Sequence, residues 1–322
     1  MVFCSYESNS IMIETWLQAL PHGITLSCRA AGQRGRPVLI FLHGFPEAAF
    51  VWDTLLEHFA KPENGGYRCV APNLRGYEKS SSPTEVAAYR AKFLVQDIAA
   101  LADLESPNQP LACLVAHDWG GAVAWSMANQ LPQRMQRLAI VNSPHPGTFL
   151  RELQSNPQQQ AASAYMNFLI RPDAEAILAE GDYRRMWEFF TNMSAGAERF
   201  GWLTEAVKAQ YRAVWQGPPG AAPGAGLTGG CNYYRASPLR PPRPEDPAAA
   251  NITLPREMLT VSLPTLVLWA MDDIALRPEL IDGLEGYIPQ LELHRISNAT
   301  HWVVHEQPEL VAGYLGGFLA KS

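Results

Sequence analysis

The chain has 322 residues, of which 47% are hydrophobic and 17% are charged, and its formal net charge is −6. A chain of this length and composition can bury a full core, either as one large domain or as a domain with a sizeable insertion. Acidic and basic residues are mixed without long runs, which argues against a nucleic-acid or membrane-surface partner because either would require a basic patch. No glycine-rich loop of the P-loop or dinucleotide-binding type is present, and we expect no cofactor.

The cysteines are scattered, and no two of them have the CxxC spacing of a zinc site. We therefore expect free, buried thiols and no metal. The N-terminal sequence has no basic segment followed by an apolar one, and no apolar run reaches the roughly 18 residues of a membrane span. These features predict a cytoplasmic protein. The five cysteines are Cys4, Cys28, Cys69, Cys113 and Cys231.

The first part of the chain alternates strand-like and helix-like segments. The continuous apolar run at 37–42 is typical of a strand that is buried on both faces of a parallel sheet. Strands separated by helices of this length imply βαβ units and a mainly parallel sheet. In chain order, the expected strands are 24–28, 37–42, 67–71, 111–116 and 137–142, and the expected helices are 50–59, 87–104 and 120–130.

This alternation stops after Pro146. The following segment, 147–256, has a helical and aromatic-rich pattern interrupted by stretches such as 216–230, which are too rich in proline and glycine for regular structure. The alternation then resumes with a strand at 264–270, a helix, a strand at 291–296 and a last helix from about Pro308.

The expected architecture is an α/β fold of the α/β-hydrolase kind, with helices on both sides of the sheet. Its core consists of residues 1–146 and 257–322, and residues 147–256 form a helical lid inserted between the two parts. The proline- and glycine-rich stretches could equally link two domains, but the last strand and helix are too small to fold alone.

The most informative motif follows the strand that ends at Ala116. Its sequence, HDWGG, has the small-x-nucleophile-x-glycine pattern of a nucleophile elbow, with Asp118 at the position where a lipase has serine. Small residues at Ala116 and Gly120 let strand and helix approach closely, so the central side chain projects beyond the carboxyl edge of the sheet, where α/β proteins bind ligands. Taken alone, Asp118 could as well cap the following helix.

A second motif, HGFPE at residues 43–47, follows a core strand. A turn of this kind exposes backbone N–H groups that can stabilise an oxyanion, although by itself it could be an ordinary tight loop. Together with the elbow, it predicts an oxyanion hole formed by the N–H groups of Phe45 and Trp119.

A catalytic triad of this fold needs an acid and then a histidine further along the chain. Asp272 and Asp273 follow one expected strand, and His301 follows the next. Because no carboxylate lies between Ala139 and Leu150, the acid position after the preceding strand is vacant. His305 is expected to be structural, and His145 at the start of the lid could line the pocket.

An aspartate nucleophile restricts the substrate. A carboxylate suits displacement at a saturated carbon with a good or strained leaving group, and the resulting ester would be hydrolysed by water that His301 deprotonates. Epoxides and alkyl halides both fit. An epoxide also needs a proton donor, such as a tyrosine with a pKa of about 10, whereas a halide needs only N–H donors. The lid offers Tyr165, Tyr183, Tyr211, Tyr233 and Tyr234, and Trp187, Trp202 and Trp215.

Six motifs together resemble those of the α/β-hydrolase epoxide hydrolases of bacteria and mammals. They are HGFPE, HDWGG, NSPHPGTFLREL, CNYYRAS, WAMDDIALRPEL and NATHWVVHEQPELV, and they occur in the family's order. The resemblance implies that Asp118 is the nucleophile, that Asp273 rather than Asp272 is the acid of the triad, and that His301 is the base. It also implies that Tyr234 polarises the epoxide and that Tyr165 is the second tyrosine of this kind.

The resemblance further implies a small-molecule epoxide and water as partners of a monomer or homodimer. We expect the substrate pocket to be lined by His43, Pro46, His145 and Trp302. The glycine- and proline-rich segment 216–230 departs from the family pattern, and we expect it to make the lid mobile or to reshape the pocket.

Three other functions compete with epoxide hydrolysis. Haloalkane dehalogenases share the Asp-Trp pair but often have asparagine where this chain has Phe45. Fluoroacetate dehalogenases have arginine after the nucleophile, where this chain has Trp119, so a small carboxylate substrate is disfavoured. A hydrolase fold can also serve as a ligand receptor, but the complete set of nucleophile, acid and histidine argues against that function.

Overall fold

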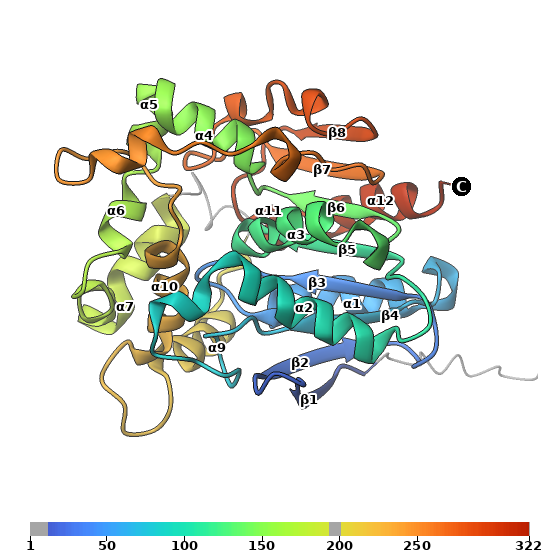
Figure 1. The fold of residues 1–322 in the computed structure, drawn as a ribbon. Helices are drawn as coiled ribbons and strands as arrows, with labels where there is room; N and C mark the ends of the chain where they lie inside the picture. Colours follow the sequence, from blue (N-terminus) through green and yellow to red (C-terminus); the bar gives the residue numbers. More distant parts are fainter. Residues whose placement is uncertain (1–11, 193–200, 322) are drawn as a thin grey trace, which may run out of the picture.

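A mixed eight-stranded sheet, in the order β1-β2-β4-β3-β5-β6-β7-β8, runs through the molecule (Figure 1). The computed structural model describes residues 12–192 and 201–321, so Cys4 lies outside the described residues. From β4 to β8 neighbouring strands pair in parallel, whereas β2 is antiparallel to both β1 and β4. The strands are β1 Glu14–Ala19, β2 Thr25–Ala31, β3 Val38–Leu42, β4 Arg68–Pro72, β5 Cys113–His117, β6 Leu138–Val141, β7 Thr265–Ala270 and β8 Leu291–Ile296.

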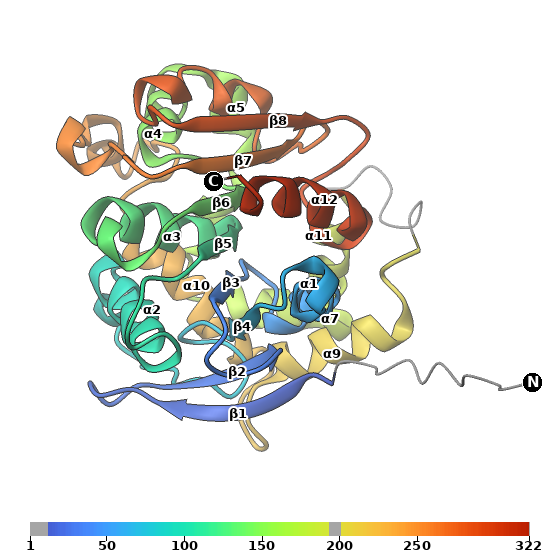
Figure 2. The same cartoon turned by 90° about the vertical axis from the view of Figure 1, so that its right-hand side faces the viewer.

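The central strands are buried along their whole length. Every residue of β3, β5 and β6 is buried, because helices cover both faces of the sheet. Helices α2 (Ala91–Glu105) and α3 (Asp118–Gln130) lie on one face, and α1 (Asp53–Ala60) and α12 (Pro308–Leu319) lie on the other (Figure 2). This arrangement confirms the expected α/β class.

A layer of helices lies beside one end of the sheet, at the left of Figure 1. It follows β6 in the chain and precedes β7, and its helix α7 is interrupted at residues 180–183, where the backbone is not helical. A further short helix, α11 (Val303–Glu306), follows β8. The helices between β6 and β7 are α4 Pro146–Ser155, α5 Pro157–Ala162, α6 Tyr165–Leu169, α7 Ala174–Asn192, α9 Glu205–Gln216 and α10 Thr228–Ala236.

Two properties of the described residues bear on the expectations about compartment and cysteine chemistry. None of the helices within 12–192 and 201–321 combines the length and the hydropathy needed to cross a bilayer. The four described cysteines, Cys28, Cys69, Cys113 and Cys231, are buried and free.

The structure differs from the sequence expectations at two places along the sheet. Strand β1 was not expected. It is an edge strand in which exposed residues alternate with half-buried ones, and this pattern does not indicate that it pairs with β2. Among the described residues between β7 and β8, the expected helix is absent. The chain there forms two 3-10 turns, Pro278–Ile281 and Leu284–Gly286, because Gly283 between them has a left-handed conformation with φ of 81°.

The expectation of irregular structure throughout 216–230 is wrong at its end, because α10 begins at Thr228. The glycines there are required by close packing: a Cβ on Gly229 would lie 2.1 Å from the carbonyl oxygen of Gly76, and one on Gly226 would lie 2.1 Å from that of Val214. This part of the chain is therefore in backbone contact with its neighbours.

The same close packing makes Gly120 sensitive to substitution. A Cβ at Gly120 would lie 2.4 Å from the carbonyl oxygen of Leu42, so we expect Gly120→Ala to lower the free energy of unfolding by roughly 1–3 kcal/mol in chemical denaturation. Gly317, in α12, is the matched control, because no atom lies within 4 Å of its added Cβ. Gly317→Ala should raise stability by roughly 0.5–1 kcal/mol. Equal effects of the two substitutions would contradict this account.

Candidate active site

Asp118 lies at the sharp turn between β5 and α3 and has a φ of 47°, a left-handed conformation that is uncommon for residues other than glycine. Two glycines make room for this turn. A Cβ at Gly44 would lie 2.3 Å from Asp118 Oδ1, and Gly120 approaches the backbone after β3 just as closely. The side chain of Asp118 retains 12% exposure and faces a cavity.

One of the two expected oxyanion-hole residues contacts this carboxylate directly. The backbone N–H of Phe45 donates a hydrogen bond to Asp118 Oδ1 at 2.7 Å. Trp119 is the second residue of α3, and the first N–H groups of a helix have no acceptor within the helix. Its N–H is thus available at the same turn.

The structure brings Asp118, His301 and Asp273 together at the carboxyl edge of the sheet. His301 Nε2 lies 3.8 Å from Asp118 Oδ2, and His301 Nδ1 lies 2.7 Å from Asp273 Oδ2. The other oxygen of Asp273 accepts the N–H groups of Ala275 and Leu276, both at 2.9 Å. The neighbouring Asp272, in contrast, is exposed.

Sequence reasoning missed Asn142, which supports Asp273 from the next strand. Asn142 Nδ2 donates to Asp273 Oδ2 at 2.9 Å, and its Oδ1 accepts the N–H of Ala270 at 2.7 Å. It directly follows β6, in the segment noted above for lacking a carboxylate. An amide after a core strand was the available signal, and its role could not be assigned without the pairing of β6 with β7.

The charge on His301 is governed by its buried neighbours. Burial by itself lowers the pKa of His301, but Asp273, Asp118 and Glu47 outweigh it and raise this pKa to about 9. With a hydrogen bond from Nδ1 to Asp273, the ring presents Nε2 to Asp118.

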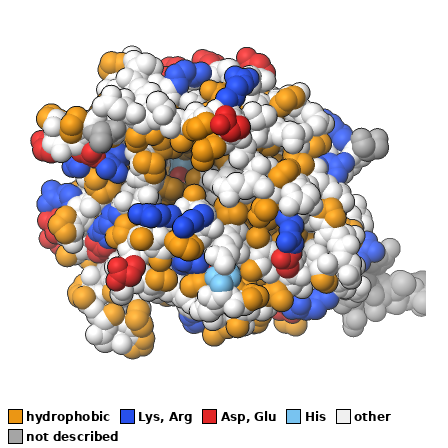
Figure 3. Space-filling view, in the orientation of Figure 1, with side chains coloured by type: hydrophobic (Ala, Val, Ile, Leu, Met, Phe, Trp, Pro, Cys, Tyr) orange, Lys and Arg blue, Asp and Glu red, His pale blue; other side chains and the backbone are white. Residues whose placement is uncertain are grey.

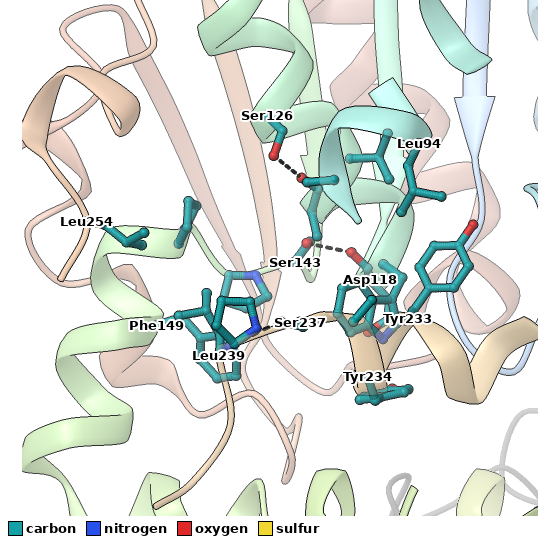
Figure 4. Close-up of a pocket in the computed structure, with 18 of the residues that line it drawn as sticks. Leu94, Asp118, Ser126, Ser143, Phe149, Tyr233, Tyr234, Ser237, Leu239 and Leu254 are labelled. Atoms are coloured by element: carbon teal, nitrogen blue, oxygen red, sulfur yellow. Dashed lines mark hydrogen bonds between the residues drawn. The ribbon is translucent and has the colours of Figure 1, made fainter. Parts of the chain in front are cut away.

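Asp118 lies in the wall of a cavity of about 420 Å³, here called the α3 cavity (Figure 4). Trp119, Tyr165 and Tyr234 line it as well. A second cavity of about 500 Å³, here called the α7 cavity, lies on the other side of Tyr165 and is lined by Phe45, Met186 and Phe189 among others. On the face shown in Figure 3, a hollow bordered by hydrophobic side chains opens between the helical layer and the sheet.

Three tyrosines that line the α3 cavity with Asp118 come from helices between β6 and β7: Tyr165 from α6, and Tyr233 and Tyr234 from α10. Burial raises the pKa of Tyr234 well above its usual range, and the charge of Asp118 adds to this effect. The pKa of Tyr165 is raised for the same two reasons. Tyr233 differs because its hydroxyl donates to the carbonyl of Arg75 at 3.0 Å. Tyr165 and Tyr234 therefore remain protonated phenols near a carboxylate.

Four residues expected to line the pocket lie instead within the protein interior. In the described part of the chain, neither cavity is lined by His43, Pro46, His145 or Trp302. The Nε2 atom of His43 accepts the N–H of Leu74 at 3.0 Å, and burial lowers the pKa of His43 to about 4.

The other three of these residues also make structural contacts. The carbonyl of Pro46 accepts the indole N–H of Trp215 at 2.7 Å, and the indole N–H of Trp302 donates to Phe190 O at 3.0 Å. His145 Nε2 lies 2.8 Å from Leu259 O, and the residues on either side of His145 in the chain, Pro144 and Pro146, do line the α3 cavity.

A buried polar network also escaped sequence reasoning. The carboxylate of Glu47 contacts His117 Nδ1 at 3.1 Å, His305 Nε2 at 2.9 Å and the hydroxyl of Tyr211 at 3.1 Å. Burial raises the pKa of Glu47, but the two histidines outweigh it and hold that pKa far below its usual range. His117 Nε2 in turn lies 2.9 Å from the carbonyl of His301. The network joins the HGFPE loop, strand β5, the loop that carries His301, and helix α9.

Known proteins share this architecture. The family model described as the alpha/beta hydrolase fold matches residues 37–308. Epoxide hydrolase 4 of Mus musculus is 32% identical over 306 residues, which cover 93% of this chain and 77% of the relative. The AB hydrolase superfamily protein YfhM of Bacillus subtilis is 32% identical over 292 residues, which cover 90% of this chain and 92% of the relative. A solved structure described among novel epoxide hydrolases in metagenomes from hot environments has a TM-score of 0.82 and 37% identity, covering 97% of this chain and all of that chain.

The sheet order, the turn at Asp118 and the family match define an α/β hydrolase. The relatives narrow this class. The chain belongs to the α/β-hydrolase-fold epoxide hydrolase family, which confirms the resemblance inferred from its motifs.

The electrostatic coupling between Asp118 and His301 can be tested directly. Because the charge of Asp118 helps to raise the pKa of His301 to about 9, we expect Asp118→Ala to lower this pKa. The measurement is an NMR titration of the His301 ring. Asp272→Ala, which removes an exposed carboxylate next to Asp273, is the control and should leave the pKa of His301 in place. An unchanged His301 pKa in Asp118→Ala would show that the two groups are not coupled.

Proposed function

We propose that this protein hydrolyses epoxides to vicinal diols through a covalent ester on Asp118. The observation that carries the proposal is one arrangement: a carboxylate at a nucleophile turn, a histidine 3.8 Å from it, and two protonated tyrosines lining the same cavity. The relatives, which include Epoxide hydrolase 4 of Mus musculus, support the same reaction.

In the first step, Oδ2 of Asp118 attacks a ring carbon of the epoxide. The carbon–oxygen bond of the ring breaks, and its electron pair goes to the epoxide oxygen. Tyr234 and Tyr165 donate hydrogen bonds to that oxygen, and one of them transfers its proton. Since their pKa values are raised, both phenols carry the proton in the resting enzyme.

In the second step, water attacks the carbonyl carbon of the ester while His301 Nε2 accepts its proton. Negative charge develops on Oδ1 of Asp118, which already accepts the N–H of Phe45, and the N–H of Trp119 is the second donor. Collapse of this intermediate expels the diol oxygen, which takes the proton from His301. The second proton of the water, which remains on the new carboxyl group, returns to the tyrosine that gave up its proton in the first step, so the Asp118 carboxylate and the phenol are both restored. Asp273 holds the ring of His301 and stabilises its charged form.

Ester formation also prepares His301 for its role as a base. The negative charge of Asp118 is one of the groups that raise the pKa of His301. Esterification removes this charge, so the pKa of His301 falls and the neutral ring becomes available when water must be deprotonated. The second step should therefore slow as the pH falls below the His301 pKa of the ester form.

We assign residues 147–256 to a lid on a core formed by 1–146 and 257–322. The proposal is supported by the helical layer between β6 and β7, which supplies both tyrosines. The described free thiols are compatible with a cytoplasmic enzyme, acting without a cofactor on a small epoxide and water as a monomer or homodimer.

The nucleophile role predicts that Asp118→Ala lowers diol formation from a styrene-oxide-like epoxide by roughly 10⁴-fold or more. Circular dichroism checks that the variant remains folded. A single turnover in oxygen-18 water should place the label in the Asp118 carboxylate of the wild-type protein. Undiminished turnover by the folded variant would exclude the ester mechanism, and turnover of a bromoalkane panel but of no epoxide would indicate a dehalogenase.

The proton-donor role predicts that Tyr234→Phe slows ester formation by roughly 10²-fold and leaves ester hydrolysis much less affected. Stopped-flow measurements that resolve the two steps test this, and Tyr165→Phe should act on the same step. Tyr233→Phe is the matched control, because that hydroxyl already donates to a backbone carbonyl. Equal slowing of both steps would remove Tyr234 from this role.

A further inference from the structure

We propose that the α3 cavity receives one elongated, uncharged, apolar substituent of the epoxide, which extends from Asp118 along helix α3. This inference rests on the proposed function, because it assumes that the reacting carbon lies at Asp118. The substrate class is then epoxides that have a long apolar chain on one ring carbon.

The cavity follows one side of α3 over the full length of the helix. Asp118, Ala122, Ser126 and Gln130 are spaced four residues apart, and all four line the cavity. At 1.5 Å per residue, the distance from the first to the last is about 18 Å. The two intermediate residues are small, which leaves space for a ligand between the helix and the opposite wall.

The opposite wall is apolar. Phe149, Leu239 and Leu254 face the helix across the cavity (Figure 4). Apart from Asp118, no charged side chain of the described residues lines this cavity. Such a wall stabilises a chain of methylene groups by removing it from water.

The polar groups of the α3 wall are largely engaged within the protein. The Ser126 hydroxyl donates to the carbonyl of Ala122 at 3.0 Å. Asn129 Nδ2 donates to the carbonyls of Glu257 and Thr260, both at 2.8 Å. The wall therefore offers few donors to a polar substituent, which favours an apolar one.

The far end of the cavity is open. Gln130 is exposed, and Met258, another lining residue, is 56% exposed. A substituent longer than the cavity can therefore continue into solvent. The cavity volume of about 420 Å³ lies in the range of sites for drug-sized ligands. This volume is larger than the space that a small epoxide fills.

The α7 cavity is a less suitable place for this substituent. Asp118 does not line it, and its wall includes the charged residues Arg185 and Glu188. Tyr165 lies between the two cavities and lines both. The two cavities thus predict different effects when either one is blocked.

The test uses the whole protein and a series of terminal 1,2-epoxyalkanes of increasing chain length. An extended chain covers about 1.2 Å per bond, so a length of 18 Å corresponds to about fifteen bonds. We expect kcat/KM for diol formation to rise about two- to fourfold per methylene group and to level off when the chain reaches the open end.

Substitutions then locate the chain. Ser126→Phe should make kcat/KM level off at a shorter chain, whereas Ser126→Ala should keep the wild-type chain length. Leu239→Trp narrows the same cavity from the lid side and provides a second block if Ser126→Phe does not fold. Ala162→Phe, which fills the α7 cavity, is the matched control and should not change the levelling point.

The outcomes separate this inference from the proposed function. Turnover of short epoxides without any dependence on chain length would overturn the inference and leave the epoxide hydrolase function intact. A shift of the levelling point in Ala162→Phe but not in Ser126→Phe or Leu239→Trp would assign the chain to the α7 cavity and also overturn it. Absence of turnover with every epoxide, long or short, would overturn the proposed function itself.

Discussion

The site depends on the close approach of the loop after β3 to the beginning of α3. At this point Asp118 adopts a left-handed backbone conformation, which costs a non-glycine residue about 1–3 kcal/mol. The surrounding contacts offset this cost: the Phe45 N–H binds the carboxylate, and the Ser143 hydroxyl donates to the carbonyl of Asp118 at 2.7 Å. Gly121 allows Ser143 to come this near, since a Cβ there would lie 2.2 Å from the serine. The turn is therefore held from β3, β5 and β6 together.

Around this turn, the buried charges are paired in two connected sets. One set joins Asp273 to His301 and Asn142, and the other joins Glu47 to His117 and His305. The carbonyl of His301 bound by His117 links them. A buried charge that loses its partner is costly, so each set maintains the position of the loop that contributes to it. The ring of His301 and the turn at Asp118 are thus held relative to each other by the interior of the protein.

Much of this could be predicted from sequence because it is local. The apolar run of β3 and the small residues around Asp118 identify the sheet and the elbow, and the chain order of Asp118, Asp273 and His301 is specific to one fold. What could not be predicted depends on contacts between distant segments. The pattern of β1 is too exposed to indicate a strand before its pairing with β2 is known.

The side chains near the site illustrate the same limit. A histidine in a motif such as HGFPE can face a ligand or the protein interior. The hydrogen bond that the Leu74 N–H donates to His43 Nε2 shows that His43 faces the interior. Likewise, Glu47 becomes meaningful only when Tyr211 and His305, more than 160 residues away in the chain, meet its carboxylate. Long-range polar pairing leaves no periodic signal in a sequence.

The backbone contact between Gly229 and Gly76 makes one end of the α3 cavity less tolerant of substitution than the other. Helix α10 carries both Tyr234 and Gly229. Because the backbone of Gly229 contacts the backbone of Gly76 directly, no side chain lies between them whose substitution could shift the helix by a small amount. The end of the α3 cavity near Tyr234 therefore tolerates little change at this contact, since a side chain added at Gly229 would displace the whole helix. The far wall, formed by exchangeable apolar side chains such as Leu239 and Leu254, has no such restriction. Substitutions in that wall can change the shape of the cavity without displacing α10.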